Sequence, residues 1–170
     1  MSASKEGPQP LVPAYAERRE NCPRYRFAGG VWIILADAAR TAGHIANLEA
    51  IYGEGGGLPY LIRQREAEFA YVLTGRVRIL IGDAEETVAH PGAMVYVPAG
   101  VGRQFIADVE GTRIYYGWVP AGSEELIRRT GVVTTELSSP FVNEPFDVET
   151  AAEFGIFAAA ATRSGPSVHK

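Results

Sequence analysis

The sequence predicts an all-β protein of one domain, built as a sandwich or barrel. Three observations lead to this fold class. Short β-branched and aromatic segments recur along the first 120 residues, and glycine or proline separates most of them. The chain has 19 glycines and 11 prolines, more than a typical soluble domain of its 170 residues. That length fits a single hydrophobic core, and no segment approaches the ~18 apolar residues of a membrane span.

Eight segments carry the strand pattern. They are residues 31–35, 44–52, 68–73, 76–81, 86–89, 94–97, 103–107 and 112–120. The chain must turn at residues 53–57, where four glycines stand in five positions and exclude a helix. We interpret this glycine-rich loop as a candidate mobile rim of the barrel.

The ends of the chain differ from its middle. Residues 1–26 are expected to form an N-terminal arm, and residues 27–120 the barrel. Residues 121–170 are expected to form C-terminal helices and a tail that pack on it. Within them, Ser123–Arg129 and Asp147–Phe154 each begin with a residue that favours the N-cap of a helix.

Charge and cysteine content exclude several classes of protein. The net charge is −4, so an electrostatic nucleic-acid binder is not expected. A single cysteine, Cys22, excludes an internal disulfide framework and a cysteine-based zinc site. The first residues lack the apolar stretch of a secretory signal, and we therefore expect a cytoplasmic protein without a membrane partner.

From Glu54 onward the chain matches two spaced patterns in part. The positions of the pattern G-x5-H-x-H-x4-E-x6-G hold Gly55, Leu61, Arg63, Glu68 and Gly75. The positions of the pattern G-x5-P-x-G-x2-H-x3-N hold Gly92, Pro98, Gly100, Arg103 and Ala107. These patterns are the two motifs of the cupin superfamily, which the sequence therefore resembles.

The resemblance covers about residues 27–157 and is greatest to small single-domain bacterial cupins of the quercetin-dioxygenase-like type. It implies the double-stranded β-helix of cupins, a jelly-roll barrel, and it implies a homodimer.

The resemblance further implies a metal held by three histidines and one glutamate, but this chain keeps only Glu68. Leu61, Arg63 and Arg103 stand at the histidine positions. Leucine has no lone pair, and arginine stays protonated and repels a cation. Alternation along its strand points His44 inward, yet His44 and Glu68 supply at most two ligands. We therefore expect no metal and no other cofactor.

In the geometry that the resemblance implies, Arg63 and Arg103 converge beside Glu68. The expected result is an Arg–Glu–Arg cluster with a net charge near +1. One interpretation is structural, an ion pair that fills the former metal site. The other is functional: the two arginines hold an oxyanion such as a carboxylate, enolate or phenolate, and Glu68 acts as general base.

Further residues are candidates for lining a ligand cavity. They are Tyr52, Tyr60, His44, Leu61, Tyr116 and Trp118. Tyr52 and Tyr60 flank the glycine-rich loop, whereas the inner face of residues 112–120 is left open by the sequence. The alternative for these aromatic residues is ordinary core filling.

Three functions compete. The first is a metal-independent enzyme, such as an isomerase, cyclase or lyase of secondary metabolism, acting on an anionic or enolisable molecule of aromatic or polyketide-like type. The second is a non-catalytic cupin that binds a small molecule. The third is a quercetinase-like dioxygenase with an unorthodox metal site. A cavity reached by Glu68 favours the first, and a Glu68 engaged by both arginines favours the second.

Overall fold

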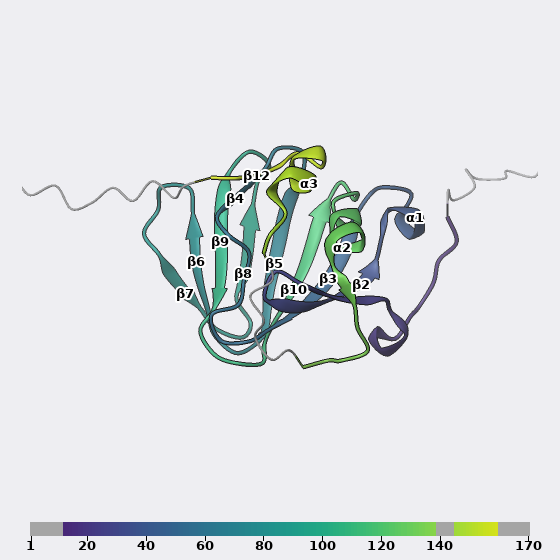
Figure 1. Cartoon of the computed structure of the whole chain (residues 1–170), viewed down its shortest axis with the longest axis horizontal. Coiled ribbons are helices and arrows are strands. Elements are labelled where there is room, and N and C mark those ends of the chain that lie inside the picture. Colours follow the sequence, from purple (N-terminus) through teal and green to yellow (C-terminus); the bar gives the residue numbers. More distant parts are fainter. Residues whose placement is uncertain (1–11, 139–144, 160–170) are drawn as a thin grey trace, which may run out of the picture.

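The computed structural model describes residues 12–138 and 145–159, whose strands form two antiparallel sheets that enclose one core (Figure 1). The larger sheet contains, in pairing order, β11 (Val132–Val133), β1 (Arg24–Phe27), β2 (Gly30–Ala36), β3 (Ala46–Tyr52), β10 (Thr112–Val119), β5 (Ala67–Thr74) and β8 (Met94–Val97). The smaller sheet contains β12 (Ile156–Ala158), β4 (Leu61–Arg63), β9 (Gly102–Ala107), β6 (Val77–Ile81) and β7 (Thr87–Ala89). This is the all-β jelly-roll architecture that the sequence predicts.

All eight expected strands are present, with ends displaced by at most two residues. The sheets also include β1, β4, β11 and β12, which are not among the eight expected strands. Three of these, β1, β11 and β12, begin outside the expected barrel region of residues 27–120. They widen both sheets with segments from the two ends of the chain.

Alternation along the strands determines which side chains enter the core. The inner face of β3 carries Leu48 and Tyr52, and the inner face of β10 carries Tyr116 and Trp118. These two strands pair directly, with Tyr116 opposite Leu48. Tyr116 and Trp118 therefore lie on the inner face of residues 112–120, which the sequence alone does not identify.

The described residues form the helices η1 (Arg19–Asn21), α1 (Ala38–Thr41), α2 (Glu124–Thr130) and α3 (Val148–Glu153). Of these, α2 contacts β1 and α3 contacts β12. α2 and α3 lie next to each other (Figure 1), and both add apolar side chains to the core. Both follow the expected starts, and the Asp147 carboxylate caps α3 by accepting the Thr150 N–H. The Ser123 hydroxyl does not cap α2; the backbone N–H of Ser123 instead donates to Glu66.

The glycine-rich loop is anchored to β9. Gly55 donates its N–H to the Ala107 carbonyl, and Ala107 donates its N–H to the Gly56 carbonyl, each at 2.8 Å. Gly57 has φ +155°, and a Cβ there would lie 2.1 Å from the Phe105 carbonyl oxygen. The loop requires glycine because it lies directly on a strand, which argues against the mobile rim expected from its composition.

No helix within residues 12–138 and 145–159 is long and apolar enough to cross a membrane.

Candidate functional site

Four charged side chains are buried together between the sheets. Arg63 comes from β4, Glu68 from β5 and Arg103 from β9, and Glu66 lies in the turn that joins β4 to β5. Each exposes between 2% and 4% of its surface. Charged groups are almost never so buried unless they are paired. We call these four residues the buried charge cluster.

Glu68 is bonded through both carboxylate oxygens. Arg103 Nε donates to Oε1 at 3.1 Å. Trp118 Nε1 donates to Oε2 at 2.7 Å, and Arg63 Nε lies 3.3 Å from the same oxygen. The structure therefore brings Arg63, Glu68 and Arg103 to one point, as the resemblance to cupins implies.

Arg63 connects the interior of the barrel to the start of α2. Its Nη1 donates to Glu66 Oε2 at 2.9 Å, and its guanidinium carbon lies 3.9 Å from the centre of the Trp118 ring. The other oxygen of Glu66 accepts the Ser123 N–H at 3.1 Å. Contacts to two carboxylates and one aromatic face fix the orientation of Arg63.

The net charge near +1 expected for the cluster is wrong, because Glu66 also belongs to it. With Glu66 included, two guanidinium groups face two carboxylates. Glu66 lies in the turn before β5 begins at Ala67, so alternation along a strand does not reveal it.

The surroundings of Glu68 keep it ionised. Burial raises its pKa, but the charges of Arg103 and Arg63 and the hydrogen bonds from Arg103 and Trp118 outweigh burial and hold the pKa below its ordinary value. Burial lowers the pKa of Arg103, and the charge of Glu68 opposes that change. A carboxylate with a lowered pKa and two engaged oxygens is a weak proton acceptor at neutral pH.

Arg103 uses only one of its three guanidinium nitrogens in a hydrogen bond with another described residue. Its Nε is bonded to Glu68, but Nη1 and Nη2 are buried and have no hydrogen-bond partner among the described residues. The same holds for the indole nitrogen of Trp32, elsewhere in the same core. The interior thus presents N–H donors without acceptors, an arrangement that is rare in folded proteins unless water or a ligand completes it.

Two tyrosines lie within electrostatic reach of the cluster. The hydroxyl oxygens of Tyr52 and Tyr116 are 3.3 Å apart, and the Tyr116 ring stacks on Trp32 with ring centres separated by 5.2 Å. Burial raises the pKa of both tyrosines, so both remain protonated at neutral pH. Together with Trp118 they form an aromatic wall beside the charges.

Two of the expected cavity residues do not face the interior. His44 is exposed and precedes the first residue of β3, so the parity argument fails where the strand has not begun. Tyr60 donates its hydroxyl to the Gly82 carbonyl and covers Gly102. Neighbouring residues of a strand face opposite sides of the sheet, and Arg103 faces the interior. Gly102 therefore faces outward, and Tyr60, which covers it, lies on the outer face of the smaller sheet. Leu61 is buried opposite Arg103, as expected.

The donor set does not fit the metal that the cupin resemblance implies. Glu68 accepts hydrogen bonds from Arg103 and Trp118 and forms an ion pair with Arg63. Leu61, Arg63 and Arg103 cannot donate a lone pair to a cation. No group of three histidine, cysteine, aspartate or glutamate side chains that could hold a metal occurs in residues 12–138 and 145–159. His44 is too exposed to complete one with Glu68.

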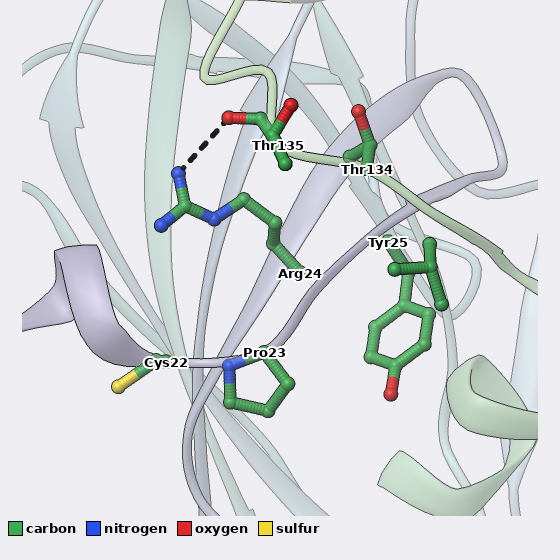
Figure 2. A pocket seen from close by; sticks show the side chains of 7 residues that line it. Cys22, Pro23, Arg24, Tyr25, Thr134 and Thr135 are labelled. Atoms are coloured by element: carbon green, nitrogen blue, oxygen red, sulfur yellow. Dashed lines mark hydrogen bonds between the residues drawn. The ribbon is translucent and has the colours of Figure 1, made fainter.

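Three surface pockets are lined by described residues, with volumes of about 220, 340 and 360 Å³. Figure 2 shows the smallest, between β1 and the segment after β11, where Arg24 donates to the Thr135 carbonyl at 3.3 Å. The Cys22 thiol points away from the other labelled side chains there (Figure 2). None of these three pockets is lined by a member of the buried charge cluster.

Comparison with known proteins supports the fold. Residues 48–116 match the family model described as the cupin domain. A search of curated protein sequences found no significant match. The match covers fewer than half of the 170 residues, and together with the two sheets described above it supports a cupin jelly-roll fold.

Several solved structures share this fold. KdgF from Halomonas sp. is 13% identical, with a TM-score of 0.57 over 66% of this chain and 99% of that one. An RmlC-like cupin from Shewanella frigidimarina is 16% identical, with a TM-score of 0.57 over 66% and 96%. The Streptomyces nucleoside dehydratase Pac13 is 14% identical, with a TM-score of 0.55 over 66% and 88%. At these identities the likeness defines the fold alone.

Replacing Arg103 with leucine is expected to destabilise the protein. The change leaves Glu68 with Arg63 and Trp118 but without its Oε1 partner, at an expected cost of about 3 kcal/mol. Urea unfolding at neutral pH measures the loss. The control is Arg76→Leu, which removes a half-exposed arginine and is expected to change stability little. An Arg103→Leu protein as stable as the wild type would show that the pair is not buried in solution.

Glu68→Gln is expected to reduce stability in a pH-dependent way. The pKa of Glu68 is lower in the folded chain than in the unfolded chain, so its charge stabilises the fold above the unfolded pKa of about 4.3. That contribution is lost as the pH falls through the folded pKa. The stability gap between wild type and variant should therefore be widest near neutral pH and narrow in acid. Glu85→Gln, at an exposed position, is the control; a gap independent of pH would contradict the assignment.

Proposed function

We propose that this protein is a metal-independent cupin that binds a small anionic molecule inside its barrel, with Arg103 as the anion-binding residue. The observation that carries the proposal is the pair of buried Arg103 Nη atoms without partners among the described residues. A buried donor without an acceptor costs about 1–3 kcal/mol. An anion at these atoms would remove that cost and add a charge-assisted hydrogen bond.

Glu68 then has a supporting role. It balances the charges of Arg103 and Arg63 and fixes the Arg103 side chain through Nε. Its engaged oxygens and lowered pKa favour the binding function over proton transfer by Glu68. The donor set likewise gives no support to a quercetinase-like dioxygenase, because that chemistry needs a metal.

The second candidate is a metal-independent enzyme acting on an enolisable molecule. Arg103 would stabilise a developing oxyanion, since a preorganised cation in a water-poor site is an effective catalytic group. Pac13 is described as a nucleoside dehydratase, so a cupin barrel can accommodate the removal of water. That analogy extends only to the fold. The isomerase, cyclase or lyase of secondary metabolism that we expect from the sequence would need a proton acceptor other than Glu68 as it stands.

The expected homodimer and cytoplasmic location remain predictions. The outer face of the larger sheet supports a dimer, because Tyr71, Met94 and Tyr96 expose 38%, 62% and 55% of their surfaces there. Two of them belong to β8, the edge strand of that sheet.

Anion binding can be followed through the tryptophans. Both tryptophans of the chain, Trp32 and Trp118, are buried in the barrel core, so their emission reports on a ligand bound there. The probes are acetate, benzoate, inorganic phosphate and phenylphosphonate. At least one should change the emission and raise the melting temperature, and Arg103→Gln should weaken its affinity by about tenfold or more.

Arg76→Gln is the matched control, because it removes the same charge from the surface. Its affinity should equal that of the wild type. Absence of binding by all four anions, or an Arg103→Gln protein that binds as well as the wild type, would contradict the proposal.

A further inference from the structure

We infer that the anion taken up by Arg103 is a planar monocarboxylate, whose carboxylate lies against Nη1 and Nη2 of that residue. This inference rests on the proposed function and narrows its ligand to one chemical class. It follows from three features of the barrel interior: the balance of charge, the donors that remain free and the shape of the aromatic side chains.

The balance of charge sets the charge of the ligand. Arg63 faces Glu66 and Glu68, and Arg103 faces Glu68, so the cluster is neutral before a ligand arrives. Within the cluster, Arg103 has two terminal nitrogens without a hydrogen-bond partner among the described residues. Nη1 of Arg63 is bonded to Glu66, and Nε of Arg63 makes no hydrogen bond but lies 3.3 Å from the Glu68 carboxylate. Each additional negative charge must be desolvated in a region where all four members are at most 4% exposed. A neutral cluster has no net positive charge to offset a second negative charge on the ligand, so the single free edge of Arg103 favours a monoanion over a phosphate-like dianion.

The free donors set the shape of the anionic group. The hydrogen bond to Glu68 uses Nε of Arg103 and leaves the edge formed by Nη1 and Nη2. Two N–H groups on that edge point in parallel, and their spacing matches the two oxygens of a carboxylate. A carboxylate therefore satisfies both nitrogens at once, whereas a single-atom acceptor satisfies fewer donors.

The aromatic side chains set the shape of the rest of the ligand. Trp32 stacks on Tyr116 with an interplanar angle of 18°, and Phe105 meets Tyr116 edge-on with ring centres 5.9 Å apart. Phe105 lies two residues after Arg103 on β9, so both side chains point into the same interior. Flat, largely apolar walls next to one cationic edge match a flat ligand with its charge at one end.

Four related probes test the inference by isothermal titration calorimetry at mildly alkaline pH. Benzoate is a planar monocarboxylate, and benzamide is its uncharged counterpart. Phenylphosphonate carries a second charge, and cyclohexanecarboxylate keeps the carboxylate on a ring that is not flat. We expect benzoate to bind, and each of the other three to bind at least about tenfold more weakly.

Arg103→Lys separates charge from geometry. Lysine keeps the positive charge but lacks the two-pronged edge, so the affinity for benzoate should fall by about tenfold or more. Arg76→Lys, at the surface, should leave it unchanged.

The outcomes separate the inference from the proposed function. Phenylphosphonate binding as tightly as benzoate, with Arg103-dependent affinity, would overturn the inference and leave the proposed function standing. Cyclohexanecarboxylate binding as tightly as benzoate would do the same. Equal affinity for benzamide and benzoate, or a crystal soaked in benzoate that shows only water at Nη1 and Nη2, would overturn both.

Discussion

The carboxylate of Glu68 lies between two sheets with 2% of its surface exposed, and the cost of keeping a charge there shapes its surroundings. Arg103 and Trp118 bond its two oxygens, and Arg63 adds a second positive charge. That second charge itself needs a partner, which Glu66 supplies.

The contacts that balance these buried charges extend from the barrel to the C-terminal helices. Glu66 accepts the backbone N–H of Ser123, the residue before α2, so the position of that helix is coupled to Arg63. α2 and α3 in turn add Leu126, Ile127 and Ala151 to the core of the barrel. The Glu68 carboxylate is thus linked to the start of α2 by its ion pair with Arg63 and by the hydrogen bonds from Arg63 and from Ser123 to Glu66. Its neighbours fix it in place, which suits a supporting role better than a proton-transfer role.

Much of this arrangement could be predicted from the sequence, because it depends on local pattern. Alternation and turn residues locate eight of the strands, and the resemblance to cupins implies that Arg63, Glu68 and Arg103 converge. The predictions from sequence fail for residues outside a regular strand and for strands that depend on distant partners. His44 keeps the parity of a strand that begins only at Ala46, and Tyr60 covers Gly102 on the outer face. The shortest strands, such as β11 and β12, exist only through partners far away in the sequence.

The metal content of the purified protein tests the central claim most directly. The protein is purified without chelator, dialysed against iron, manganese, nickel and zinc, and analysed by mass spectrometry. A cluster in which arginines replace metal ligands predicts less than about a tenth of an equivalent of any of them. About one equivalent of a single metal would contradict it, because Glu68 would then have to leave Arg103 and Trp118 to bind the ion.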